Sequence, residues 1–198
     1  VRRSIQVSSF VMYFFMTLLA VVSKPIIILL LTEKWAPAVP YMQMICISSM
    51  IAIMSTANMQ AIKAIGRSDI VLKLEFWKKP AFLIILFGAV HHSVFAVALT
   101  MPIYSLYAAM VNMWPNKKLL NYSIMEQLRD QLPAILLASV SAIAAYPLLY
   151  LNINQYLIMI LQIVTCSILY FGLSHIFRVE TYSYLIISVK NFIKNRKK

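Results

Sequence analysis

Long apolar runs separated by short polar connections divide the chain into six segments. Each run is close to the roughly 20 residues that an α-helix needs to cross about 30 Å of hydrocarbon. The runs cover residues 8–31, 40–64, 71–90, 92–113, 131–151 and 155–177. The uncharged stretch between Pro80 and Trp114 is too long for one crossing, so we divide it at residues 88–92. The pattern predicts an all-α, polytopic transmembrane bundle of about six spanning helices.

Composition supports lipid as the solvent. The 198 residues are 62% hydrophobic and 12% charged, whereas soluble domains are about half apolar and a quarter charged. The net charge is +12, from 18 Lys and Arg against 6 Asp and Glu. These basic residues lie between apolar runs, where the positive-inside rule and anionic lipids account for them. We therefore expect membrane lipids as partners and no nucleic acid.

The basic residues alternate between connections. Every Lys and Arg lies in connections on one side of the predicted membrane, except Lys34 on the other side and Lys24 within the first run. This alternation requires an even number of crossings and predicts that both ends of the chain are cytoplasmic. We expect a six-helix bundle over residues 1–178 and a basic cytoplasmic tail over residues 179–198.

The tail from residue 182 to residue 198 is amphipathic. Leu185, Val189, Phe192 and Ile193 share one helical face, and Lys190, Lys194 and Lys197 share another. This arrangement predicts a helix lying on the inner membrane surface, held by apolar burial and by anionic lipid.

Among the candidate site residues, Lys24 has the position that is most costly to insert into a membrane. It lies deep in the first run and is followed by Pro25. A lysine at the centre of a span costs roughly 3 kcal/mol on insertion scales and usually faces a cavity or a partner. Pro25 lacks an N–H and favours a bend there. Lys24 is either a cavity cation that attracts an anionic substrate or a side chain that extends to the outer surface.

The densest charged region covers residues 63–79. Gly66 suits the end of the second helix as a C-cap, and Ser68 or Asp69 suits the N-cap of the third. Glu75 is placed to pair with Lys78 or Lys79 one turn away. Lys63, Arg67, Lys73 and Glu75 are the candidate residues of this region. They predict either a cytoplasmic gate and lipid-phosphate contact or an ordinary basic loop with local ion pairs.

Polar side chains on the second and sixth helices either line a watery path or bond neighbouring helices. They are Ser48, Ser49, Ser55, Thr56, Asn58, Gln60, Gln162 and Thr165. The adjacent residues His91 and His92 point apart on a helix and predict no metal site. Cys46 and Cys166 lie in apolar runs and predict no disulfide. We find no phosphate-binding loop or catalytic motif, so we expect no enzyme and no cofactor.

Two segments carry a family resemblance. Residues 28–41, ILLLTEKWAPAVPY, resemble a region of bacterial polysaccharide exporters, the Wzx-type flippases. Residues 63–69, KAIGRSD, with the following Lys73-Leu-Glu75, resemble the same proteins. These belong to the multidrug/oligosaccharidyl-lipid/polysaccharide exporter superfamily, and the similarity is greatest to its colanic-acid and lipopolysaccharide branch. The specific part covers residues 25–80, while the remainder agrees in helix spacing and hydropathy.

The resemblance implies one lobe of a two-lobe inner-membrane transporter. Its substrate would be undecaprenyl-diphosphate-linked oligosaccharide, moved to the outer leaflet by alternating access. An anionic diphosphate would need cations, of which Lys24 is the best placed. Our candidate substrate contacts are therefore Lys24, Lys63 and Arg67, and our candidate coupling or gating residues are Glu75 and Lys73. Because the chain starts at Val1, we expect a fragment whose partner is an N-terminal lobe of the same protein. The alternatives are a multidrug/cation antiporter, a membrane-embedded envelope-biosynthesis enzyme and a structural membrane subunit.

Overall fold

The computed structural model describes the backbone of residues 2–196, and these residues form helices joined by short turns, with no β-strand among them. The longer helices are α1 (Arg2–Val21), α3 (Val39–Ala64), α4 (Ser68–Val90), α5 (Val94–Met113), α7 (Ile124–Ala145), α8 (Gln155–Ile176) and α9 (Glu180–Arg196). The shorter ones are α2 (Ser23–Leu31), η1 (Glu33–Ala38), α6 (Asn116–Leu119) and η2 (Tyr146–Tyr150). The side chains of Val189 and of residues 191–198 lie outside the described part.

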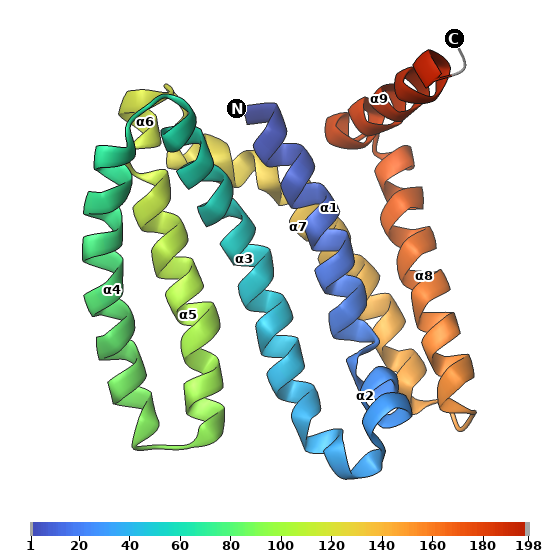
Figure 1. Ribbon diagram of the computed structural model, residues 1–198. Coiled ribbons are helices and arrows are strands. Elements are labelled where there is room, and N and C mark those ends of the chain that lie inside the picture. The colour runs from blue at the N-terminus through green and yellow to red at the C-terminus, as the bar shows by residue number, and fades with distance from the viewer. Residues whose placement is uncertain (1, 197–198) are drawn as a thin grey trace.

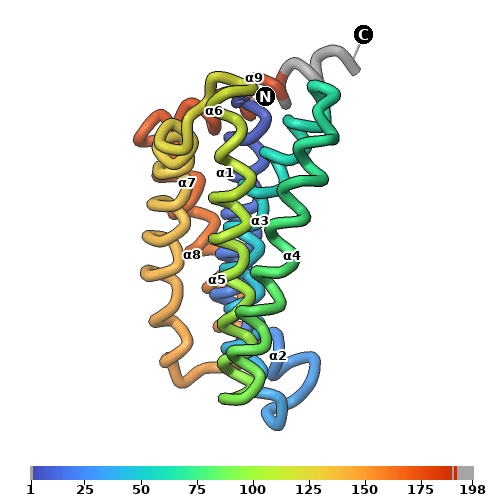
Figure 2. Tube along the Cα trace, turned by 90° about the vertical axis from the view of Figure 1, so that its left-hand side faces the viewer, coloured from blue at the N-terminus to red at the C-terminus, as the bar shows by residue number. Residues whose placement is uncertain are grey.

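The long helices run up and down in a bundle, and the connections lie at its two opposite ends (Figure 1). One end holds the start of α1, the α3–α4 turn, α6 and α9. We call it the basic end, because Arg3, Arg67, Lys117 and Arg178 lie there. The other end holds α2 with η1, the α4–α5 turn and the α7–α8 connection (Figure 2). The predicted alternation of basic and uncharged connections therefore corresponds to two ends of the bundle.

Within residues 2–196, five helical segments are long and apolar enough to cross a membrane. They are Arg2–Val21, Glu33–Ala64, Val94–Leu119, Ile124–Tyr150 and Gln155–Ile176. The remaining predicted span, residues 71–90, corresponds to α4, which is 23 residues long and runs beside α5. It differs from the other five in its charge. Asp69, Lys73, Glu75, Lys78 and Lys79 all lie in its first half.

The first apolar run contains a break, as Pro25 predicted. Val22 separates α1 from α2, and its backbone N–H still donates to the Leu18 carbonyl at 3.0 Å. Pro25 has no N–H to donate to the carbonyl four residues earlier, so the helix cannot continue unbroken through this point. The last turn of α2 then ends at Thr32, whose φ of 77° redirects the chain into η1.

Aromatic side chains form the core where α1, α7 and α8 meet. Phe10, Tyr13 and Phe14 of α1 pack against Tyr170 of α8 and Leu137 of α7. The Phe10 and Tyr170 ring centroids are 5.0 Å apart, and the Tyr170 hydroxyl donates to the Phe10 carbonyl at 2.8 Å. Burying each such ring contributes about 2–3 kcal/mol in water. In lipid, tight packing and the interhelical hydrogen bond take over that role.

The contact between α3 and α5 is held by buried amides. Asn112 donates to the Ser55 hydroxyl at 2.6 Å and to the Ser55 carbonyl at 3.3 Å. Asn116 donates to the Asn58 side-chain oxygen, and Asn58 donates to the Met54 carbonyl at 2.8 Å. Among the predicted path-lining residues, Ser55 and Asn58 therefore bond a neighbouring helix.

The α3–α4 turn follows directly from its sequence. Gly66 has a φ of 77°, a conformation that glycine adopts at low cost. Its N–H donates to the Lys63 carbonyl, and the Arg67 N–H donates to the Ile62 carbonyl, which closes a Schellman motif. The prediction for Gly66 is confirmed. The prediction that Ser68 or Asp69 is the N-cap of the next helix is wrong. Helix α4 already begins at Ser68, and Arg67 occupies the N-cap position.

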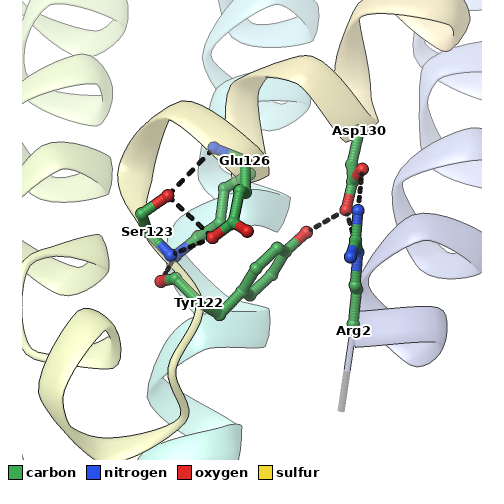
Figure 3. Close-up of polar contacts among 6 residues, drawn as sticks. Arg2, Tyr122, Ser123, Glu126 and Asp130 are labelled. Carbon is green, nitrogen blue, oxygen red and sulfur yellow. Dashed lines mark hydrogen bonds and ion pairs between the residues drawn. The ribbon is translucent and has the colours of Figure 1, made fainter.

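Three helix starts among the described residues have side-chain caps, at Ser93, Ser123 and Asn154, whose side chain accepts from the Tyr156 N–H at the start of α8. Ser93 accepts a hydrogen bond from the Ala96 N–H at the start of α5. Ser123 and Glu126 form a reciprocal capping box at the start of α7 (Figure 3). The predicted break at residues 88–92 is confirmed, because α4 ends at Val90 and α5 begins after Ser93.

The predicted tail helix is present as α9 and lies obliquely across the basic end (Figure 1). Tyr182 and Leu185 pack against the aromatic core of α1 and α8. Among the residues predicted to define its two faces, Val189, Phe192, Ile193, Lys194 and Lys197 lie outside the described side chains.

Candidate functional site

Three of the predicted site residues lie at or near the basic end. Lys63 is in the last turn of α3 and Lys73 is in α4, and both are exposed. Arg67 forms an ion pair with Asp69, with Nε and Oδ1 3.0 Å apart. The hydrogen bond to Arg67 lowers the pKa of the Asp69 carboxyl and raises that of the guanidinium. Because both side chains are about half exposed, this pair contributes little stability.

Lys24 lies apart from these residues. It is the second residue of α2, in the half of the bundle that leads to the opposite end, and its side chain is exposed. Its neighbour Ser23 is buried and contacts the Gln43 amide at 3.3 Å. The five predicted site residues therefore do not form one compact cluster.

Glu75 and Lys78 form the ion pair that their spacing predicted. Lys78 Nζ lies 2.5 Å from Glu75 Oε1 and 3.4 Å from the Met59 sulfur of α3. The Lys78 side chain is 4% exposed and that of Glu75 is 33% exposed. A lysine this deeply buried requires a charged partner, so Glu75 and Lys78 are a coupled unit. Lys78 is the more buried member of this pair.

A groove runs along the middle of α1, between α3 and α7, with a volume of about 440 Å³. We call it the α1 groove. Its walls are lined by Tyr13, Thr17, Ala20, Val21, Gln43, Ile47, Met50, Ile135, Ala138, Ser139, Ala142 and Tyr146. Its volume is within the range of small-molecule sites, about 300–1,000 Å³. The groove is thus a ligand-sized hollow in the part of the bundle that separates its two ends.

The polar groups of the α1 groove are uncharged. Thr17 is 2% exposed, and its hydroxyl oxygen has no hydrogen-bond partner among the described residues. Gln43 contacts the Ala20 carbonyl at 3.4 Å. Tyr13, Ser139 and Tyr146 add three hydroxyl groups to the same lining. A buried hydroxyl without a partner is costly, whereas Ser139 and Tyr146 are exposed in the same lining.

A second, more polar cavity of about 720 Å³ lies at the basic end. Its lining includes Arg2, Gln6, Arg129, Asp130 and Glu180, from α1, α7 and α9. Arg2 is held against Asp130, and Asp130 also accepts a hydrogen bond from Tyr122 (Figure 3). This cluster closes the α1–α7 contact at the end of the bundle.

Other polar residues predicted on the second and sixth helices either form hydrogen bonds or line a hollow. Ser48 and Ser49 donate to carbonyls of their own helix, and Gln162 lies 3.4 Å from the Ala145 carbonyl of α7. Thr56 and Gln60 line a hollow of about 420 Å³ between α3 and the first turns of α1. Within the described residues, no three metal-ligating side chains gather.

Two features of the site were not predicted from the sequence. The Arg2–Asp130–Tyr122 cluster joins residues 128 and 8 positions apart, and no local spacing indicates such a contact. Thr17 and Tyr13 read as ordinary residues of an apolar span. A hydroxyl in every turn of the run, at Ser9, Tyr13 and Thr17, was the available signal.

Comparison with known proteins adds no relative to this description. No protein-family model, curated protein or solved structure matches the chain.

Proposed function

We propose that this chain is one lobe of a transporter in the bacterial inner membrane that moves undecaprenyl-diphosphate-linked oligosaccharide to the outer leaflet. The observation that carries the proposal is the α1 groove, a largely apolar hollow with a few hydroxyl and amide groups in its lining, midway along an apolar helical bundle. The resemblance of residues 25–80 to Wzx-type exporters supplies the substrate class. A second lobe facing the groove would complete the cavity for alternating access.

Six crossings are part of the proposal. Helix α4 follows α3 through a tight turn and runs antiparallel beside α5, which is itself apolar enough to span. Its charged residues lie toward the basic end, and its most buried charge is paired with Glu75. With α4 as a span, the basic end faces the cytoplasm and both chain ends lie there.

The groove chemistry suits a sugar. The amide of Gln43 and the hydroxyl of Ser139 provide hydrogen bonds for carbohydrate hydroxyls, and the ring of Tyr146 provides a flat apolar face. No formal charge lines this groove within the described residues. The diphosphate would instead meet cations outside it, at Lys24 on one side and at Lys63 and Arg67 of the basic end on the other.

The test is translocation by the intact gene product in proteoliposomes, followed with a fluorescent polyprenyl-diphosphate oligosaccharide whose outer-leaflet fraction is quenched by dithionite. Ser139→Ala removes an exposed hydroxyl of the groove lining. We expect it, and Gln43→Leu, each to slow translocation about fivefold, the effect of one lost hydrogen bond. Ser49→Ala, which removes a hydroxyl bonded only within α3, is the matched control.

Unchanged translocation in both groove variants would reject the groove as the sugar path. Absence of translocation by the wild-type protein, with efflux of cationic drugs instead, would favour the antiporter.

A further inference from the structure

An aromatic slot lies between α4 and α5 near the basic end. Leu74 and Trp77 of α4 and Tyr107, Val111 and Trp114 at the end of α5 line it, and its volume is about 630 Å³. We call it the tryptophan slot. Trp77 is 71% exposed and Trp114 is 73% exposed. Two large indole rings therefore form an apolar hollow that this chain itself does not fill.

The slot is a consequence of helical spacing. Leu74 and Trp77 are one turn apart on α4, while Tyr107, Val111 and Trp114 follow at intervals of four and three on α5. The two helices are antiparallel neighbours (Figure 1). The slot therefore runs along the helices and has its mouth at the level of the basic end.

Exposed lysines flank this mouth. Lys73 is four residues before Trp77, so the two side chains share a face of α4. Lys117 and Lys118 follow Trp114 by three and four residues, in α6 at the basic end. None of the three lysines has an ion-pair partner among the described residues.

The acidic side chains near the slot already form ion pairs with other residues. Asp69 pairs with Arg67, and Glu75 pairs with Lys78 on the buried side of α4. The region around the slot therefore presents positive charge together with an aromatic, elongated hollow. That combination matches a molecule with an anionic head and an apolar chain.

We propose that the tryptophan slot binds an anionic phospholipid, with one acyl chain between Trp77 and Trp114 and the phosphate at Lys73, Lys117 and Lys118. The site depends on the membrane placement in the proposed function and not on transport. Burial of acyl methylenes against the indoles would provide apolar contact, and each lysine near the surface adds electrostatic attraction. The bound lipid would anchor the α4–α5 hairpin in the inner leaflet.

The experiment uses tryptophan fluorescence, because the chain has three tryptophans and Trp35 lies in η1 at the opposite end. Trp35→Phe leaves the two slot indoles as reporters, and a Trp77→Phe/Trp114→Phe variant leaves Trp35 as the control reporter. Each protein is reconstituted in phosphatidylcholine vesicles that contain a small fraction of bromine-labelled phosphatidylglycerol or bromine-labelled phosphatidylcholine. Bromine on the acyl chain quenches only indoles that it contacts.

We expect half-maximal quenching of the slot indoles at an about tenfold lower fraction of brominated phosphatidylglycerol than of brominated phosphatidylcholine. A Lys73→Gln/Lys117→Gln/Lys118→Gln variant should bring the two lipids within about twofold of each other. The matched control removes three charges from the other side of the same end, as Arg3→Gln/Arg129→Gln/Arg178→Gln, and should keep the preference.

Equal quenching of the slot indoles by the two lipids would overturn the lipid site. The same preference at Trp35, or its loss in both triple variants, would also overturn it, because general attraction to the net charge would then be the cause. Quenching of all three indoles by brominated phosphatidylcholine reports membrane insertion by itself. Failure of the lipid site and failure of the membrane placement are therefore distinguishable.

Discussion

Arg2 and Asp130 form a two-pronged ion pair that joins α1 to α7. Arg2 Nε lies 2.5 Å from Asp130 Oδ2, and its Nη2 lies 2.7 Å from Oδ1. The Tyr122 hydroxyl donates to the same carboxylate at 2.6 Å (Figure 3). The Asp130 side chain is 9% exposed, whereas that of Arg2 is 58% exposed. The carboxylate is thus the buried centre of the cluster, and the guanidinium closes it from outside.

Asp130→Asn should lower the stability of the bundle. The change removes the negative charge that accepts hydrogen bonds from Arg2 and Tyr122. Because Arg2 is exposed, the free energy of unfolding should fall by only about 1 kcal/mol. Thermal unfolding in detergent measures it. Arg129→Gln alters an exposed neighbour on the same helix and should leave the midpoint unchanged. Equal midpoints for Asp130→Asn and wild type would show that the pair does not tie α1 to α7.

Tyr122 should ionise at unusually high pH. Burial, followed by the hydrogen bond to Asp130, raises its pKa above the ordinary value of about 10. The raised pKa favours the protonated folded state. Its stabilising contribution is therefore complete below pH 10 and is lost as pH rises through the folded-state pKa. The difference in ultraviolet absorbance between wild type and Tyr122→Phe isolates this titration, and a midpoint at or below pH 10 would contradict the contact.

Asn112→Leu should weaken the α3–α5 contact. The substitution conserves volume approximately and removes the donor that reaches Ser55 on α3. Interhelical hydrogen bonds of this kind contribute about 1 kcal/mol in membrane proteins. Unfolding in mixed micelles with increasing denaturing detergent measures the loss. Ser49→Ala, whose hydroxyl bonds within its own helix, is the control and should change little.

Glu75→Gln should have two separable effects. It leaves the buried Lys78 ammonium without its partner, and breaking a buried pair costs about 3–5 kcal/mol, here reduced because Glu75 is one-third exposed. Glu75→Gln combined with Lys78→Met should recover much of that stability. If Glu75 couples transport to an ion gradient, the stable double variant should still lose gradient-driven export. Normal export would leave the pair with a structural role only.

Local chemistry made several helix ends predictable. Gly66 marks the α3–α4 turn because its positive φ is needed there, and Pro25 marks the break after α1. The spacing of Glu75 and Lys78 predicted their pair for the same local reason. Long-range relationships were not predictable in this way. The burial of Lys78 depends on Met59 of α3, and the contact of Arg2 with Asp130 depends on how α1 packs beside α7.

The proposed function requires a topology in which the helices cross a membrane six times with the basic end in the cytoplasm. Single cysteines test it in a chain that carries Cys46→Ala and Cys166→Ala, both buried positions. Exposed positions at the opposite end are Lys34, His92 and Asn152, and those at the basic end are Ser68, Lys118 and Glu180. A membrane-impermeant maleimide is applied to spheroplasts before and after permeabilisation.

We expect labelling at positions 34, 92 and 152 in intact spheroplasts, and labelling at positions 68, 118 and 180 only after permeabilisation. If α4 does not cross, position 92 becomes cytoplasmic and position 118 becomes external. Labelling at position 118 before permeabilisation, with protection at position 92, would therefore contradict the six-crossing topology and the transporter lobe built on it.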